Sequence, residues 1–482
     1  MGKTEEADPQ SLQKYGVPLF SAAWLPYKEV RSNLQSHHDD VDSSEQQEQE
    51  KEETPEASSS SYEYYVVLAG GGGEGSSGIP NAVLLSRFDF SSNSLSSQPI
   101  AKLGFGSDVP YRMVIIPGGD GLICAFPNSC RFFEWHEVKD NEDQKLGVKL
   151  SDKVLTQLED VGQQLALAFN NDSSVLAAGG EDGNLRVFKW PSMEIILNEA
   201  QAHASLKDLC FSPDGKFLVS LGKRDLGRVW DVTSSTAVAT LSKENDEIFA
   251  LCRFSQSSDQ TQILYIAAIT DKGASIVTWN TSSWNRVSSK PVAREPVSSF
   301  NVSPDGKLLA MYIIFTVTLR GLTQGDVLLI NSTNMRVHTM IRKAHLGIVT
   351  ALAFSHDSRA LVSASMDSSA RVTLVEDNKS GMYIEIQIFL PVIGSSAMVG
   401  HRPGNSWTVN SESKVHTAKY EDTFGDDFYM LEPLSLISHC KELSFLSCLA
   451  AGGSRLRIII FIIMLAIAAY FLKNQGALPF PG

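Results

Sequence analysis

The 482-residue sequence contains few cysteines, and none of them pairs at the spacing of a metal site. A structural zinc site or a disulfide framework needs a recognisable cysteine or histidine spacing, and the chain shows neither. We therefore expect small, buried, unpaired thiols in a reducing compartment. The six cysteines are Cys124, Cys130, Cys210, Cys252, Cys440 and Cys448.

The sequence also lacks an excess of positive charge. It has 41 Lys and Arg residues against 55 Asp and Glu residues, a net charge of −14, so nucleic acid is excluded as the expected partner. The negative charge is concentrated between residues 39 and 56, where nine acidic residues stand beside one lysine. Such a run cannot bury apolar surface, so we expect an acidic disordered loop over residues 39–61.

Apolar runs are scarce, and the N-terminus shows none that would form a secretory signal peptide. The long run is near the C-terminus, where fifteen apolar residues extend from Ile458 to Leu472 between Arg457 and Lys473. Fifteen residues span roughly 22 Å as a helix, somewhat less than the ~27 Å of an endoplasmic reticulum bilayer, and the flanking cations can snorkel. We expect a transmembrane anchor over residues 455–474, a short lumenal tail over 475–482 and a cytosolic N-terminal part; a buried core helix is the alternative.

One phrase recurs along the chain: an apolar run, a Ser/Asn-Pro/Asn-Asp-Gly/Ser turn and a second apolar run. The last apolar residues before each turn are separated by 54, 42, 43, 48 and 52 residues, a period typical of four-stranded propeller blades. Together with a strand pair from Tyr64 to Phe90, the six copies predict an all-β fold, a seven-bladed WD-repeat β-propeller within residues 1–380. The six marker residues are Ile115, Phe169, Phe211, Phe254, Val302 and Phe354.

Two histidines precede their blades at the place where such repeats bury a structural His–Asp hydrogen bond. They are His203 and His345, and the end of one blade reads Arg228-Val229-Trp230-Asp231. We interpret both histidines as core residues without a catalytic role.

Two stretches depart from the blade pattern. Residues 312–321, beginning at Tyr312, lengthen one interval by about ten residues, and we expect an insertion outside the blade whose removal raises the melting temperature. Residues 381–454 contain no blade phrase and are expected to form an irregular linker. The alternative for both stretches is a specialised loop for a partner.

The most distinctive segment is the glycine-rich stretch from Ala69 to Val83, whose loop lies between the runs YYVVLA and AVLLSRFDF. A hairpin needs two to five linking residues, whereas this connection takes about a dozen. The loop lacks the Gly-Lys-Ser/Thr ending of a phosphate-binding P-loop and the helix that follows a dinucleotide fingerprint. Its composition alone indicates a flexible or cation-ordered loop.

The glycine loop, the upstream segment KYGVPLFSAAWLP, the propeller and the C-terminal apolar run together resemble one family. It comprises the membrane-anchored guanine-nucleotide exchange factors of the endoplasmic reticulum, including the prolactin regulatory element-binding protein, and the details are most similar to plant members. The similarity covers residues 14–38, 62–380 and 455–475. It implies promotion of GDP release from the small GTPase that starts coat-protein-II vesicles, in support of ER-to-Golgi transport, without covalent chemistry.

The resemblance also implies roles for residues of the loop. The family's loop is ordered by potassium through backbone oxygens and meets the GTPase, which places the contact on Ile79, Pro80 and Asn81. Asn81 falls on the functionally sensitive asparagine of the family, although a turn-stabilising side chain is the alternative. The implied potassium ligands are Gly71, Gly72, Gly73, Gly78, Ile79 and Asn81.

Other functions stay open. A relative that has lost exchange activity would act as a propeller scaffold, or as an accessory for the exit of one transporter from the endoplasmic reticulum. An enzyme needs a nucleophile–base or paired-carboxylate arrangement, and the sequence shows none above chance. The retained glycine loop favours an exchange factor over a relative that has lost exchange activity.

Overall fold

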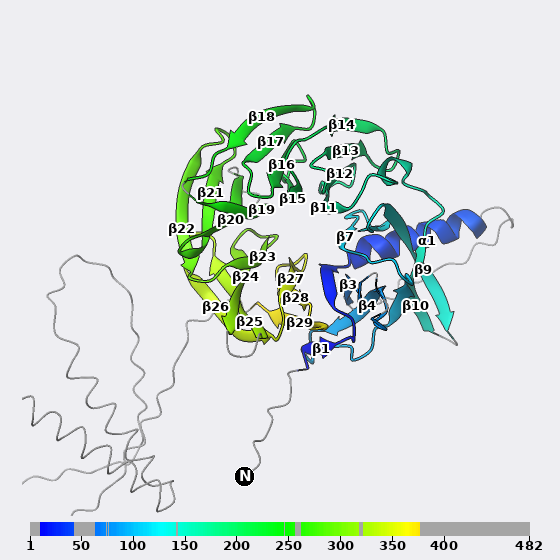
Figure 1. Ribbon diagram of the computed structural model, residues 1–482. Helices are drawn as coiled ribbons and strands as arrows, with labels where there is room; N and C mark the ends of the chain where they lie inside the picture. Colours follow the sequence, from blue (N-terminus) through cyan, green and yellow to red (C-terminus); the bar gives the residue numbers. More distant parts are fainter. Residues whose placement is uncertain are drawn as a thin grey trace, which may run out of the picture. The chain divides into compact units, whose positions relative to one another are not determined.

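The computed structural model describes residues 10–375, apart from 43–62, 74, 76, 141–142, 245, 256–261 and 318–321. Within the described residues, seven antiparallel sheets are arranged as a ring (Figure 1), which confirms the predicted seven-bladed propeller. The expected linker 381–454, anchor 455–474 and tail 475–482 lie outside the described residues, as does most of the acidic run.

Each blade places one strand at the centre of the ring, and neighbouring central strands contact one another. The six predicted marker residues are the last residues of six of these strands, because an apolar residue there closes the blade core just before the turn. The central strands are β2 (Leu19–Trp24), β7 (Arg112–Ile115), β11 (Gln164–Phe169), β15 (Leu206–Phe211), β19 (Ile248–Phe254), β23 (Val297–Val302) and β27 (Val349–Phe354).

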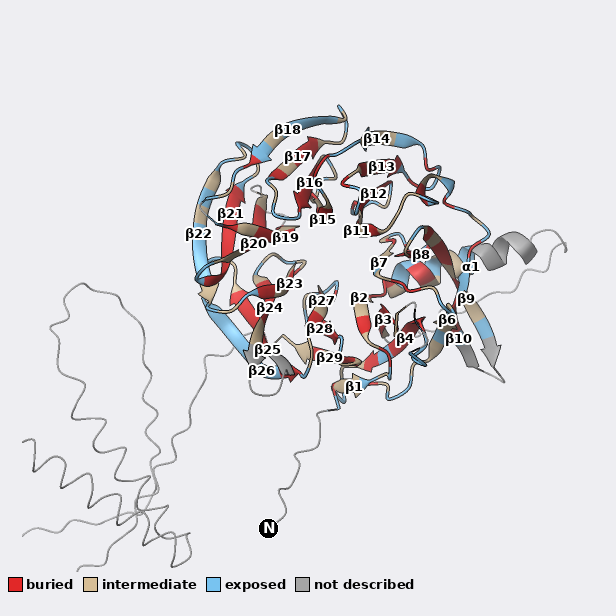
Figure 2. Cartoon of the chain, in the orientation of Figure 1, coloured by how far each residue is buried: buried red, intermediate tan, exposed pale blue. Residues whose placement is uncertain are grey.

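The second and third strands of each blade carry most of the buried apolar side chains (Figure 2). The second strands are β3 (Tyr64–Gly70), β8 (Gly121–Ala125), β12 (Val175–Gly180), β16 (Phe217–Gly222), β20 (Ile263–Thr270), β24 (Leu308–Val317) and β28 (Ala360–Ser365). The third strands are β4 (Ala82–Asp89), β9 (Cys130–Asp140), β13 (Leu185–Lys189), β17 (Gly227–Asp231), β21 (Gly273–Asn280), β25 (Leu322–Asn331) and β29 (Ser369–Leu374).

The outermost strands face solvent, and one of them closes the ring. They are β5 (Ser94–Leu95) and β6 (Ala101–Gly104), β10 (Asp143–Leu150), β14 (Ile195–Glu199), β18 (Thr236–Leu241), β22 (Arg286–Ala293), β26 (Val337–His345) and β1 (Leu12–Lys14). Strand β1 pairs with β29 in register Gln13↔Ala370, so the N-terminal segment completes the last blade. This pairing covers an edge that would otherwise expose unpaired backbone groups.

Two helices complete the described structure: α1 (Tyr27–Asp42) and the 3-10 helix η1 (Thr156–Leu158). The sequence pattern did not predict α1, and it extends to Asp42, so residues 39–42 of the expected acidic loop are helical instead. Val30 is fully buried and Arg31 pairs with Glu137 of β9 at 2.7 Å. These contacts hold the helix against the second blade, β7 to β10.

The stretch that begins at Tyr312 belongs to its blade, so the expectation of an insertion outside the blade is wrong at this end. The stretch lengthens β24 and β25, which stay paired from Leu308↔Asn331 to Val317↔Leu322. Tyr312 is fully buried and its hydroxyl donates to Gly347 O at 2.8 Å. Removing Tyr312–Arg320 would therefore take a filled position out of the core and lower stability.

The two histidines are buried, as predicted, but their partners differ. His203 Nδ1 lies 2.9 Å from Asp225 Oδ2, the expected direct His–Asp contact. His345 Nδ1 instead lies 2.6 Å from Ser369 Oγ, whose hydroxyl also bonds to Asp367. In that blade the serine stands between the imidazole and the carboxylate.

The cysteines that the structure describes are free thiols, and three of the four are buried. Burial raises the pKa of Cys130 to about 12 and that of Cys210 to about 11. Within the described part of the chain, no helix combines the length and the apolar character that crossing a membrane requires.

Candidate functional site: the glycine loop

The glycine loop joins β3 to β4 in the first blade, which comprises β2 to β6. It begins after the last ladder pair, Gly70↔Ala82. Strands of a propeller blade alternate in direction, so connections from second to third strands leave the ring at one end, which we call the glycine-loop end. The base of the loop is tied to the segment before β2, because Gly71 N donates to Pro18 O at 2.9 Å.

The Asn81 side chain is buried and holds the loop from inside; only 2% of the residue is exposed. Its Nδ2 group donates to Gly73 O at 3.2 Å and to Gly106 O at 3.0 Å. Its Oδ1 accepts from Gly73 N at 3.3 Å. The Asn81 amide therefore connects two loops of the first blade: the glycine loop and the loop between β6 and β7.

Two glycines are required where the loop turns back on Asn81. A Cβ on Gly71 would lie 1.9 Å from Asn81 Oδ1, far inside van der Waals contact. Gly73 has φ +99°, a conformation that side chains rarely adopt. Glycine is needed in this part of the loop because the backbone passes directly over the Asn81 amide and leaves no room for a side chain.

The exposed part of the loop is its tip. Ile79 is 40% exposed, and Pro80 beside it is also exposed. Ile79 N donates to Ser77 Oγ at 3.3 Å, so the tip has a local hydrogen bond of its own. Of the three residues expected to contact a GTPase, Ile79 and Pro80 face solvent, whereas the Asn81 side chain is already committed to the loop.

The loop offers neutral oxygen donors in a small space. A Cβ on Gly72 would lie 2.9 Å from Ile79 O, so these two backbone segments pack closely. The Gly73 carbonyl is engaged by the Asn81 amide. In the described residues no three His, Cys, Asp or Glu side chains gather around a metal position. Backbone carbonyl oxygens can replace the hydration shell of a monovalent cation.

Sequence reasoning missed the loop between β6 and β7, which supports the site from the neighbouring side. Phe105 N donates to Asn81 O at 2.9 Å, and Gly106 has φ +62°. Asp108 in the same loop pairs with Arg131 at 2.7 Å. The available signal was the Phe105-Gly106-Ser107-Asp108 turn sequence, whose position beside the glycine loop depends on the closed ring.

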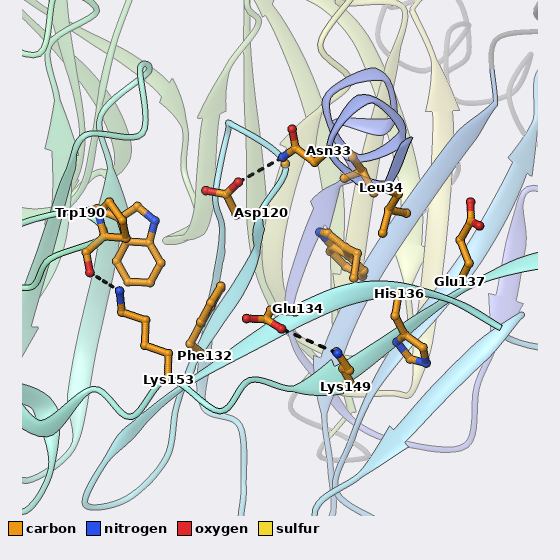
Figure 3. A pocket seen from close by; sticks show the side chains of 14 residues that line it. Asn33, Leu34, Asp120, Phe132, Glu134, His136, Glu137, Lys149, Lys153 and Trp190 are labelled. Carbon is orange, nitrogen blue, oxygen red and sulfur yellow. Dashed lines mark hydrogen bonds and ion pairs between the residues drawn. The ribbon is translucent and has the colours of Figure 1, made fainter. Parts of the chain in front are cut away.

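A separate cavity of about 780 Å³ lies beside α1, between β9, β10 and Trp190 (Figure 3). Its polar groups pair with one another: Lys149 Nζ lies 4.0 Å from Glu134 Oε2, and Asn33 donates to Asp120 at 3.1 Å. Lys153 lies over the Trp190 ring at 4.9 Å. These pairings leave the cavity walls occupied by internal contacts, and we assign no role in the site to this cavity.

Known proteins resemble this chain in sequence. Three stretches match the model of the WD domain, G-beta repeat: residues 159–189, 196–231 and 336–373. SEC12-like protein 2 of Arabidopsis thaliana is 55% identical over 373 residues, 77% of this chain and 90% of the relative. SEC12-like protein 1 of the same plant is 30% identical over 303 residues, 62% of this chain and 72% of the relative.

A more distant match names an activity. The guanine nucleotide-exchange factor SEC12 of Rattus norvegicus is 25% identical over 265 residues, which cover 50% of this chain and 61% of the relative. The protein of the same name from Mus musculus matches equally well.

Proposed function

The chain belongs to the SEC12-like family, and from this premise we propose that it is a guanine-nucleotide exchange factor. Its substrate is the small GTPase that initiates coat-protein-II vesicle formation at the endoplasmic reticulum, and its action supports ER-to-Golgi protein transport. The observation that carries the proposal is the braced glycine loop with the exposed tip residues Ile79 and Pro80. An exchange-inactive scaffold or transporter accessory would not need an apolar tip held so firmly in place.

The proposed mechanism breaks no covalent bond. A GTPase holds its nucleotide through Mg²⁺, a P-loop and switch segments. An exchange factor accelerates release only if it binds the nucleotide-free state more tightly than the loaded state. Ile79 and Pro80 supply an apolar surface for the switch region. Asn81 acts as a positioning residue, because its buried amide fixes the loop without reaching the surface.

We propose potassium as the ion of the loop. The backbone oxygens of Gly71, Gly72 and Ile79 would hold it, and the ion would add rigidity by neutralising the converging carbonyl dipoles. The smaller Li⁺ does not suit an oxygen cage sized for K⁺. We therefore expect replacement of K⁺ by Li⁺ to slow GDP release, measured with a fluorescent nucleotide at constant ionic strength; equal rates in both salts would contradict the proposal.

We propose that the chain resides in the endoplasmic reticulum membrane as a single-pass protein with its propeller in the cytosol. The apolar run from Ile458 to Leu472 supports this location. A propeller on the cytosolic face would present the glycine loop to a cytosolic GTPase.

The activity is tested with the full-length chain, purified in mild detergent because of its apolar run. The chain is added to the GTPase loaded with fluorescent GDP, and the release rate and the binding affinity are both measured. We expect the release rate to rise with the concentration of the chain. Binding to the GTPase without faster GDP release would contradict the exchange function and favour the scaffold function instead.

A further inference from the structure

The axial channel of the ring carries positive charge, in contrast to the acidic chain as a whole. The channel has a volume of about 600 Å³ and is bordered by all seven central strands. Its charged side chains lie on three blades: Arg112 on β7, Lys207 and Asp208 on β15, and Arg253 on the adjacent β19, with β11 between β7 and β15. Three cations thus stand against one carboxylate.

The single carboxylate is already satisfied by one of the cations. Asp208 is buried, and its Oδ2 accepts from Arg253 Nη1 at 2.7 Å and from Cys252 N at 2.8 Å. Arg112 and Lys207 are therefore left without a carboxylate partner of their own. The Asp208–Arg253 pair is a structural link between β15 and β19.

The remaining two cations are poorly compensated. Arg112 uses Nε and Nη1 to donate to the carbonyls of Leu165 and Tyr111, at 2.8 and 2.9 Å, neither of which carries a negative charge. Lys207 is half-buried, and within the described residues its ammonium group has no hydrogen-bond or ion-pair partner. Burial lowers the pKa of Lys207, although Asp208 opposes the effect. Arg112 is exposed, whereas the half-buried Lys207 ammonium loses part of its hydration, a free-energy cost that a bound anion would recover.

We infer that the axial channel is a binding site for a small phosphate-bearing anion, held by Lys207 and Arg112. The uncompensated charge of two matches a phosphate-class dianion, and the guanidinium offers the planar donor geometry that phosphate oxygens accept. The volume admits such an anion together with water. The site is separate from the glycine loop and does not depend on exchange activity.

The test is calorimetric titration of the full-length chain in mild detergent with inorganic pyrophosphate, without any GTPase. Lys207→Met removes the charge and keeps most of the stem, and Lys290→Met makes the same change on the exposed strand β22 as a matched control. We expect the Lys207 variant to bind pyrophosphate at least tenfold more weakly and the Lys290 variant to bind like the wild type. A melting temperature of Lys207→Met no lower than that of the wild type separates lost binding from lost folding.

A second titration uses glycerol 3-phosphate, the soluble counterpart of a lipid headgroup. Preference for it over pyrophosphate, abolished by Lys207→Met, assigns the site to a phosphate monoester of the headgroup kind and supports the inference. Absence of binding for both anions, or equal binding by Lys207→Met and the wild type, would overturn it. Because the GTPase is absent, neither result bears on the exchange function.

Discussion

The first blade and the blade formed by β15 to β18 both bury a polar side chain at the glycine-loop end, yet the two side chains have different kinds of hydrogen-bond partner. In the β15–β18 blade, the His203 ring lies 2.9 Å from Asp225 Oδ2 and 2.8 Å from Ser220 Oγ. Trp230 Nε1 also donates to that serine at 2.9 Å. The network begins and ends inside the blade, and it stabilises the ring.

In the first blade, the Asn81 amide bonds to backbone atoms of two loops, and one of those loops carries the exposed residue Ile79. Buried polar groups demand partners wherever they occur. Where the partners are side chains of the same blade, as for His203, the hydrogen bonds stabilise the fold. Where the partner is the backbone of the glycine loop, as for Asn81, the hydrogen bonds fix the exposed tip of that loop in position. The comparison predicts that changes in the first blade affect exchange, whereas changes in the β15–β18 blade affect stability.

The largest effect is expected from Gly71→Ala. Because its Cβ would lie 1.9 Å from Asn81 Oδ1, the loop must leave its braced position. We expect GDP release to slow about a hundredfold, which corresponds to ~2.7 kcal/mol. The matched control is Gly75→Ala, because a Cβ there meets nothing within 4 Å. Similar GDP release rates for the two variants would contradict the claim that the position of the glycine loop controls exchange.

The counterpart in the other blade is His203→Ala. Asp225 loses its imidazole partner and a buried space opens, so we expect the free energy of unfolding to fall by about 2–3 kcal/mol. Denaturant titration measures the loss, with His338→Ala on the exposed face of β26 as the control. GDP release per folded molecule should stay at the wild-type rate. A variant that keeps its stability but loses exchange would reverse the assignment of the two blades.

Acid should weaken the histidine-bearing blades. Burial lowers the pKa of His345 to about 4, against 6.5 for the unfolded chain. Between these values the unfolded state binds more protons than the folded state, so stability is full above about pH 6.5 and declines as the pH falls toward 4. We expect a loss on the order of 2 kcal/mol between pH 7 and pH 5, measured by denaturant titration. His345→Gln should flatten this part of the profile, and an unchanged slope would show that another group causes the loss.

The sequence predicted the seven blades because each repeat carries its own turn and its own apolar marker. It did not predict α1, since Val30 and Leu34 are isolated apolar residues in a polar stretch and their burial depends on contact with the neighbouring blade. Tyr312 was misplaced for a related reason. The interval showed extra length but could not show that both strands lengthen together and keep the tyrosine in the core.

The sequence predicted where the site lies, but not which of its residues are exposed and which are buried. Glycine content and resemblance both indicated the stretch from Ala69 to Val83. The burial of Asn81 could not be foreseen, because its partner Gly106 lies 25 residues away and meets it only when β4 and β6 pair. We therefore propose Ile79 and Pro80 as the contact residues and Asn81 as the residue that keeps the loop in position.

The most direct test of the glycine loop's role is the rate of GDP release catalysed by Ile79→Ser in the full-length chain. Val287→Ser is the control, because Val287 is 64% exposed on the outer strand β22, away from the glycine loop. We expect at least a tenfold slower release for the Ile79 variant, about 1.4 kcal/mol, with an unchanged melting temperature. Release at the wild-type rate by Ile79→Ser would contradict the claim that the exposed tip of the glycine loop drives exchange.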